Sequence, residues 1–280
     1  ENVYRESAAG GEYKEIMQAG LEYIGELDDY AMAEVLMLAR ESLALMGDSF
    51  VLDISHMGII NALMAEIPEE KSDVKDELLG RISRKDIGGI KIICEENGFS
   101  SDFSERITVL TSAYGDFDKA LEKIYEIANN DEMHSAADDL SRLYTILKSC
   151  GEEKGIRLDF SVVNDLSYYN GIIFRGFLMG VPEAVLSGGR YDKLLHKLGK
   201  KGNAAGFAVY TDLLQKYSDD EEDNDADILL IYDEKTDPSR LMKETLRLAG
   251  KGFSVRAQKN EKTKLRSGET IRFSGGNENA

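Results

Sequence analysis

The chain has 280 residues, of which 42% are hydrophobic and 31% charged, a composition typical of globular proteins. Its formal net charge of -18 makes tRNA an unlikely partner, because RNA-binding proteins usually gather Lys and Arg on one surface. The longest apolar runs, such as residues 226–232, are far shorter than the roughly 20 residues of a membrane span, so we expect no membrane partner.

Cysteine and histidine are too few and too scattered to indicate a metal site. Cys94 and Cys150 form no CxxC pair, and the three histidines do not cluster with them. We therefore expect buried, reduced cysteines in a cytoplasmic protein, and neither metal nor cofactor. Because the sequence begins at Glu1 without an initiator Met, we also expect an upstream segment.

The first 68 residues alternate between strand and helix patterns. Asp28 or Asp29 is suited to cap a helix, and Gly47 is suited to end it. The apolar spacing predicts a strand at residues 16–24, a helix at 30–45, a strand at 49–55 and a helix at 57–67 that ends before Pro68.

Residues 69–151 have an almost purely helical pattern. Apolar side chains recur at helical spacing, at Leu121 and Ile124 and again at Leu140, Leu143 and Leu147. We interpret this stretch as a helical insertion into a core formed by residues 1–68 and 152–218.

Strand patterns return after the insertion and again near the end of the chain. Residues 219–225 are almost entirely acidic, resist burial and predict a linker. Residues 226–280 then form a small α/β unit with parallel strands, which we expect to pack on the main body. The predicted strands are 157–163, 171–179, 183–186, 227–232, 253–257 and 270–273, and the predicted helices are 205–217 and 239–249.

Three segments, in this order, resemble conserved blocks of the histidyl-tRNA synthetase family. Residues 18–25 read QAGLEYIG and are similar to QxGxExIG, and residues 163–171 read VNDLSYYNG and are similar to VRGLDYYTG. Residues 187–192 and 206–208 read SGGRYD and GFA, similar to AGGRYD…GFA. Each block alone is weak evidence for the family. Because the three blocks occur in the family's order, the resemblance extends over about residues 1–214.

The resemblance implies a class II aminoacyl-tRNA synthetase-like α+β fold, with an antiparallel sheet flanked by helices. It also implies a pocket for free histidine formed by Gln18, Glu22, Tyr168, Tyr169 and Tyr191. On a strand, Gln18, Gly20 and Glu22 project to one face, and the glycine would leave room for a ligand. The alternative is a solvated strand face with tyrosines in the core.

The departures from the family pattern concern catalysis. Amino-acid activation needs fixed cations beside the α-phosphate of ATP. Asn164 and Leu213 stand where the family has catalytic arginines, and an ungapped alignment puts Tyr4 and Glu12 on two more, although a one-residue shift would restore Arg5. We therefore expect a non-catalytic chain.

A synthetase-like chain that keeps the amino-acid pocket and lacks the ATP cations resembles the regulatory subunits of short-form ATP phosphoribosyltransferase in histidine biosynthesis. The resemblance implies a partner, the catalytic subunit, together with self-association, activation of the partner and a part in histidine feedback. Two alternatives stay open: a divergent histidyl-tRNA synthetase, and a stand-alone histidine-binding paralogue.

Overall fold

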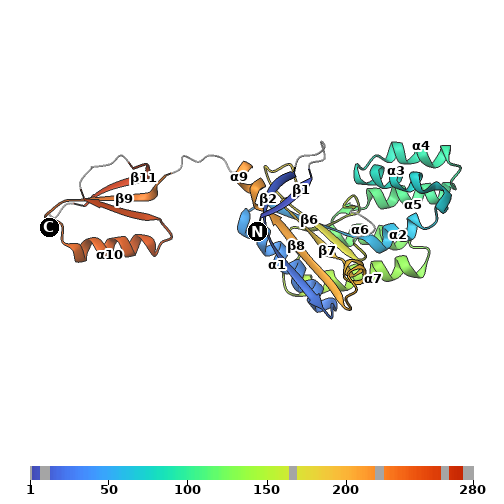
Figure 1. Ribbon diagram of the computed structural model, residues 1–280, viewed down its shortest axis with the longest axis horizontal. Coiled ribbons are helices and arrows are strands. Elements are labelled where there is room, and N and C mark those ends of the chain that lie inside the picture. Colours follow the sequence, from blue (N-terminus) through green and yellow to red (C-terminus); the bar gives the residue numbers. More distant parts are fainter. Residues whose placement is uncertain (1, 7–12, 164–168, 218–223, 260–264, 274–280) are drawn as a thin grey trace. The chain divides into compact units, whose positions relative to one another are not determined.

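The computed structural model describes residues 2–6, 13–163, 169–217, 224–259 and 265–273, and the chain divides into two compact units, Glu1–Tyr217 and Ser218–Ala280 (Figure 1). The first unit contains β1 (Asn2–Glu6), β2 (Tyr13–Gly25), α1 (Asp29–Met46), β3 (Phe50–His56), α2 (Met57–Met64), the 3-10 helix η1 (Glu69–Lys71), α3 (Ser72–Ser83), α4 (Ile87–Glu96), α5 (Ser101–Ser112), β4 (Tyr114–Gly115), α6 (Phe117–Ile127), α7 (Asp131–Ser149), β5 (Ile156–Asp159), β6 (Ile172–Leu178), β7 (Leu186–Arg190), α8 (Asp192–Lys197), β8 (Asn203–Tyr210) and α9 (Thr211–Tyr217). The second unit contains β9 (Ala226–Tyr232), α10 (Pro238–Ala249), β10 (Val255–Lys259) and β11 (Ser267–Phe273).

Within the described residues, the first unit is built on a sheet of eight strands in the order β1-β2-β8-β7-β6-β3-β5-β4. Neighbouring strands run antiparallel except β3 and β5, which are parallel. Helices flank this sheet (Figure 1). The predicted fold class is therefore confirmed. The division of this unit into a core and an insertion at residues 69 and 151 stays a prediction.

The sheet brings together segments that lie far apart in the sequence. Strand β2 pairs with β8, and β8 in turn pairs with β7. In this register Glu22 lies opposite Gly206, and Gly206 lies opposite Gly189. The first and third motifs of the sequence therefore meet on three adjacent strands.

The sequence interpretation was wrong for the segments around β7 and β8. The predicted strand 183–186 overlaps the observed one only at Leu186, and residues 205–210, predicted as part of a helix, form most of β8. Residues 203–210 are rich in Ala and Gly, which give little strand signal of their own. Pairing with β2 on one side and β7 on the other makes this segment a central strand.

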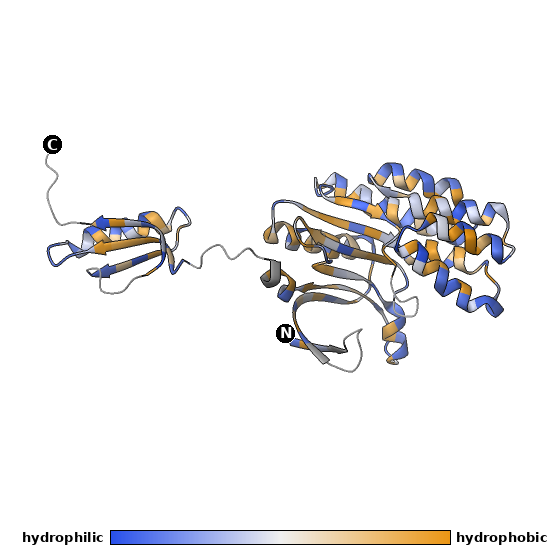
Figure 2. Ribbon diagram, turned by 90° about the horizontal axis from the view of Figure 1, so that it is seen from above, coloured by the Kyte–Doolittle hydropathy of each residue, from blue (hydrophilic) through white to orange (hydrophobic). Residues whose placement is uncertain are grey.

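The helices of residues 72–149 each bury one apolar stripe, and hydrophilic and hydrophobic residues mix along them (Figure 2). Helix α6 begins at the cap Asp116, whose side chain accepts a hydrogen bond from Lys119 N. Spacings of three and four residues put its apolar side chains on one face. The buried members of that face are Phe117, Ala120, Leu121, Ile124 and Ile127.

The second unit has a sheet of order β10-β9-β11 with both pairs parallel, as predicted. Helix α10 closes a small core over this sheet, with Leu248 against Ile228 and Leu230. The predicted acidic linker 219–225 lies mostly outside the described residues.

Cys94 is buried, as predicted, but the prediction for Cys150 was wrong, because this residue is exposed. Cys150 caps the C-terminus of α7, where the chain leaves the packed helix. In the part of the chain that the structure describes, no helix has both the length and the apolar character needed to cross a membrane.

Candidate functional site

The polar face of β2 lies beside two tyrosines from the second and third motifs. The Tyr191 hydroxyl donates a hydrogen bond to Glu22 Oε2. The Tyr169 ring meets the Tyr191 ring edge-on, with centroids 6.4 Å apart and planes at 86°. Three of the predicted site residues, Glu22, Tyr169 and Tyr191, are therefore neighbours in space. Tyr168 lies outside the described residues.

Gln18 stands four residues before Glu22 on β2, opposite Tyr210 of β8. Since side chains alternate along a strand, Gln18 and Glu22 share a face, with the α-carbon of Gly20 between them. The same face carries Ile16 before Gln18 and Ile24 after Glu22, so the polar part of the face is limited to the segment between these two isoleucines.

Glycines on the neighbouring strands make room for this arrangement. A Cβ at Gly206 would lie 2.3 Å from Glu22 Oε2, and a Cβ at Gly189 would lie 2.8 Å from the Tyr169 ring. Glycine at these two positions therefore lets the carboxyl and the phenol ring lie directly on the sheet.

Gly20 has a different role from the one predicted from the sequence. A Cβ at this position would lie 2.4 Å from the Phe207 carbonyl oxygen on β8. The space beside Gly20 is therefore occupied by the neighbouring backbone and not left for a ligand. Glycine here permits close approach of two strands.

Burial raises the pKa of the Glu22 carboxyl above its ordinary value. The residue as a whole stays exposed, while its carboxyl packs against Tyr191 and the backbone of β8. A carboxylate in such a place can accept a hydrogen bond from a ligand N–H, and a neighbouring phenol can donate or accept one.

The residues that replace the family's catalytic arginines are only partly described. Leu213 lies in α9 and packs, half-buried, against the main hydrophobic core. Tyr4 is 66% exposed on the edge strand β1. Asn164, Glu12 and the Arg5 side chain lie outside the described part of the chain.

Asp192 fixes the third motif in place. Arg190 Nε donates to Asp192 Oδ2 at 2.7 Å, and Asn170 Nδ2 donates to the same oxygen at 3.0 Å. The Ala204 backbone N–H donates to Oδ1 at 3.0 Å. Burial alone would raise the pKa of Asp192, but hydrogen bonds from these groups and from Asn203 outweigh it and hold the pKa below its ordinary value.

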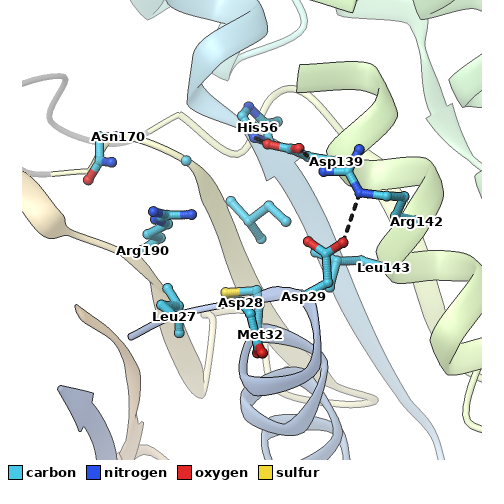
Figure 3. A pocket seen from close by; sticks show the side chains of 12 residues that line it. Leu27, Asp28, Asp29, Met32, His56, Asp139, Arg142, Leu143, Asn170 and Arg190 are labelled. Carbon is cyan, nitrogen blue, oxygen red and sulfur yellow. Dashed lines mark hydrogen bonds and ion pairs between the residues drawn. The ribbon is translucent and has the colours of Figure 1, made fainter. Parts of the chain in front are cut away.

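A pocket of about 350 Å³ lies at the end of the sheet between α1, α7, β6 and β7 (Figure 3). Arg142 bridges its wall: Nε donates to Asp29 Oδ2 at 2.8 Å, and Nη2 donates to Asp139. His56 Nε2 lies 3.5 Å from Asp139 Oδ2. The pocket is lined by Leu27, Asp28, Asp29, Met32, His56, Asp139, Arg142, Leu143, Asn170, Gly171, Ile172 and Arg190.

Sequence reasoning missed this pocket. Asp28 and Asp29 were considered only as helix caps, and His56 only as one of three scattered histidines. No local spacing connects these residues with Asp139 and Arg142, which lie in the helical region. Within the described residues, no group of three or more His, Cys, Asp and Glu side chains is arranged to hold a metal ion.

Residues 1–214 match the histidyl-tRNA synthetase family. A solved structure from Bacillus halodurans, described as an ATP phosphoribosyltransferase regulatory subunit/histidyl-tRNA synthetase, is similar with a TM-score of 0.71 at 24% identity, over 98% of this chain and 72% of that one. The sheet, the motifs and this match define a protein with the histidyl-tRNA synthetase-like, class II fold.

Curated relatives narrow the family further. An ATP phosphoribosyltransferase regulatory subunit of Acetivibrio thermocellus is 36% identical over 203 residues, which is 71% of this chain and 48% of the relative. Another, from a Thermoanaerobacter species, is 30% identical over 269 residues, which is 94% of this chain and 70% of the relative. The chain belongs to the family of ATP phosphoribosyltransferase regulatory subunits. It spans from 48% to 70% of the length of these two relatives.

Proposed function

We propose that the protein is a non-catalytic regulatory subunit that binds and activates the catalytic subunit of a short-form ATP phosphoribosyltransferase and takes part in feedback by free histidine. The observation that carries the proposal is its membership of a family whose curated members are named as regulatory subunits of this enzyme. Self-association and a cytoplasmic location belong to the same proposal.

The direct test is reconstitution with a short-form catalytic subunit from the same organism. We expect co-elution in size-exclusion chromatography and formation of phosphoribosyl-ATP only when both proteins are present. The negative net charge of the chain, -18, favours a partner surface with positive charge. Association of the two proteins should therefore be faster at low salt. Separate elution together with unchanged transferase activity would contradict the proposal and favour a stand-alone histidine-binding protein.

The same proposal assigns free histidine to the polar face of β2. Glu22 and Tyr169 are suited to orient the imidazole N–H groups, and Gln18 is suited to the α-amine. The support is the contact between Glu22 and Tyr191 and the adjoining ring of Tyr169. If histidine acts as a feedback ligand, its binding and the binding of substrates to the partner must change each other's affinity by the same factor.

Histidine binding can be measured by calorimetry in matched variants. Glu22→Gln keeps the shape of the side chain and removes its charge, and a charge-assisted hydrogen bond contributes about 1.5–3 kcal/mol. We therefore expect histidine to bind at least about tenfold more weakly to this variant. Glu26→Gln, at an exposed position beyond the end of β2, is the control and should bind histidine normally. Equal affinities in the parent and Glu22→Gln would move the site elsewhere.

We further propose that the chain does not form histidyl-adenylate. Leu213 is apolar and packs against the core, and Asn164 is neutral, so neither supplies a cation to the α-phosphate. Histidine-dependent exchange of pyrophosphate into ATP should not exceed a protein-free control. Exchange well above that control would instead support the divergent synthetase.

A further inference from the structure

The pocket between α1, α7 and β7 lies on the opposite face of the sheet from Glu22. Gly189 is in the same cross-strand row as Glu22, and its face of β7 is the one that meets Tyr169. Arg190 is the next residue, so its side chain projects to the other face, where it lines the pocket with His56. The pocket and the proposed histidine site therefore share strand β7 but not a ligand cavity.

The charges of the pocket are divided between its walls. Arg190 extends from β7, whereas Asp29 and Asp139 come from α1 and α7 on the other side (Figure 3). Arg142 accounts for only one compensating positive charge on the α1 and α7 side, through its bonds to Asp29 and Asp139. Asp28, just before α1, caps that helix by accepting a hydrogen bond from Ala31 N. The carboxylates of Asp29 and Asp139 therefore face one guanidinium there, while the β7 side presents the terminal nitrogens of Arg190, whose Nε is paired with Asp192.

Arg190 keeps hydrogen-bonding capacity for a ligand. Its Nε is used by Asp192, at 2.7 Å, whereas its two terminal nitrogens make no hydrogen bond or ion pair within the described residues. Its side chain is 33% exposed. A guanidinium with both terminal nitrogens free to donate in a fork geometry is suited to a carboxylate.

The acidic wall is held rigidly by the fold. His56 Nδ1 accepts a hydrogen bond from Gly58 N at 3.0 Å, which leaves Nε2–H to face Asp139. Hydrogen bonding from His56, supported by Arg142, keeps the pKa of Asp139 below its ordinary value. The acid is therefore ionised at neutral pH and is fixed in position from two elements.

We propose that this pocket binds a small zwitterion of the α-amino-acid class, with its carboxylate on Arg190 and its ammonium group facing the aspartates of α1 and α7. A simple anion would meet the acidic wall, and a simple cation would meet Arg190, so a molecule with both charges is the best complement. The volume of about 350 Å³ is at the lower end of the range for ligand pockets, about 300–1,000 Å³, and suits a molecule of this size.

The test uses the Glu22→Gln protein, in which the proposed histidine site is weakened, and titrates it with each of the twenty amino acids by calorimetry. We expect at least one to bind, and to bind at least tenfold more weakly when Arg190→Gln is added. Leu27→Phe, which fills the pocket without changing its charge, should also weaken binding. Thermal melts of each variant check that it is folded, and Leu27→Phe provides the test if Arg190→Gln does not fold.

A second comparison tests the class of ligand. The amino acid that binds is replaced by its deaminated acid, which keeps the carboxylate and lacks the ammonium group. We expect the deaminated acid to bind at least tenfold more weakly, because it faces the carboxylates of α1 and α7 uncompensated. Equal binding of the two compounds would overturn the zwitterion proposal. The absence of binding by every amino acid, or unchanged binding in Leu27→Phe, would overturn the site itself. Because Glu22→Gln already weakens the proposed histidine site, and Leu27 lines the other pocket, a loss of binding in Leu27→Phe distinguishes this pocket from the histidine site.

Discussion

The Glu22 carboxyl couples the candidate histidine site to pH. Burial raises its pKa above the ordinary value of 4.5, so ionisation of this group is costlier in the folded protein than in the unfolded one. Well below pH 4.5 the group is protonated in both states. As pH rises from there through the raised pKa, the folded protein loses stability relative to a variant with no charge at this position.

We therefore expect Glu22→Gln to become more stable than the parent as pH rises through this window, with a constant difference above it. Urea unfolding of both proteins from pH 4 to pH 8 measures the difference in the free energy of unfolding. Glu26→Gln, at an exposed position, serves as the control for exchanging Glu for Gln in this region of the chain. A difference between parent and Glu22→Gln that does not change with pH would mean that this carboxyl is not perturbed.

An ion pair between a buried arginine and a partly exposed glutamate connects α5 to the residues after α2. Arg106 is 8% exposed, and its two terminal nitrogens donate to the two oxygens of Glu66 at 2.6 Å each. Its Nε donates to Asp102 at 2.9 Å. The hydrogen bonds from Arg106 hold the pKa of Glu66 below its ordinary value. Removing the guanidinium leaves the Glu66 carboxylate, whose side chain is 31% exposed, without its counter-charge.

We expect Arg106→Gln to lower the free energy of unfolding by about 1.5–3 kcal/mol, the contribution of hydrogen bonds to charged groups, because Arg106 is buried whereas Glu66 keeps solvent contact. The matched control is Lys148→Gln. Lys148 pairs with Asp118 at 3.1 Å, but both side chains are more than half exposed, at 57% and 58%. Its loss should cost about 0–1 kcal/mol. Equal losses in the two variants, measured by urea unfolding, would contradict the buried pairing.

At the scale of elements, the candidate site depends on the close pairing of β2 with β8. Gly20 is one point of close approach, where a Cβ would lie 2.4 Å from the Phe207 carbonyl oxygen. This contact involves backbone on both strands and cannot be relieved by rotating a side chain. Separation of the strands would also move Glu22 away from Gly206, its partner in the register.

We expect Gly20→Ala to destabilise the protein by about 1–3 kcal/mol, as overpacking usually does, and to weaken histidine binding as well. Ala19→Thr is the control, since Ala19 is exposed on the same strand and Thr favours strands. It should stay within about 0.5 kcal/mol of the parent. Chemical denaturation and calorimetry on both variants test the prediction. A Gly20→Ala protein with unchanged stability would show that the two strands separate at little cost.

At the scale of the whole molecule, the two compact units have separate cores. The core of the first unit draws on residues up to Leu214, and the core of the second consists of residues between Ile228 and Ile271. No buried residue is shared between these two clusters in the described part of the chain. The motifs that resemble the synthetase family also lie entirely in the first unit.

We therefore expect residues 1–217 alone to fold, to keep the free energy of unfolding of the first unit and to bind histidine with the affinity of the whole chain. Circular dichroism during urea unfolding and calorimetry test both expectations. A loss of cooperativity on truncation would mean that the second unit contributes to the stability of the first.

Much of the molecule could be predicted from local sequence. Asp28 caps α1 through a hydrogen bond from Ala31 N, and apolar spacing located α6 and α7, because capping and helical periodicity involve residues three or four positions apart. The alternation along β2 predicted that Gln18 and Glu22 share a face. The order of three motifs predicted the fold class and the family, both of which are confirmed.

What the sequence could not determine depends on contacts between distant segments. Residues 203–210 are a strand only because β2 and β7 pair with them, and Gly20 is needed only because Phe207 lies beside it. The pocket that contains His56, Arg142 and Arg190 has no sequence signature, since its walls come from five elements, α1, β3, α7, β6 and β7, that local spacing does not relate. Helix capping and apolar periodicity depend on residues that are close in sequence, so the sequence alone can predict them. Strand register and the packing of helices against a sheet depend on residues that are far apart in sequence, so only the folded chain determines them.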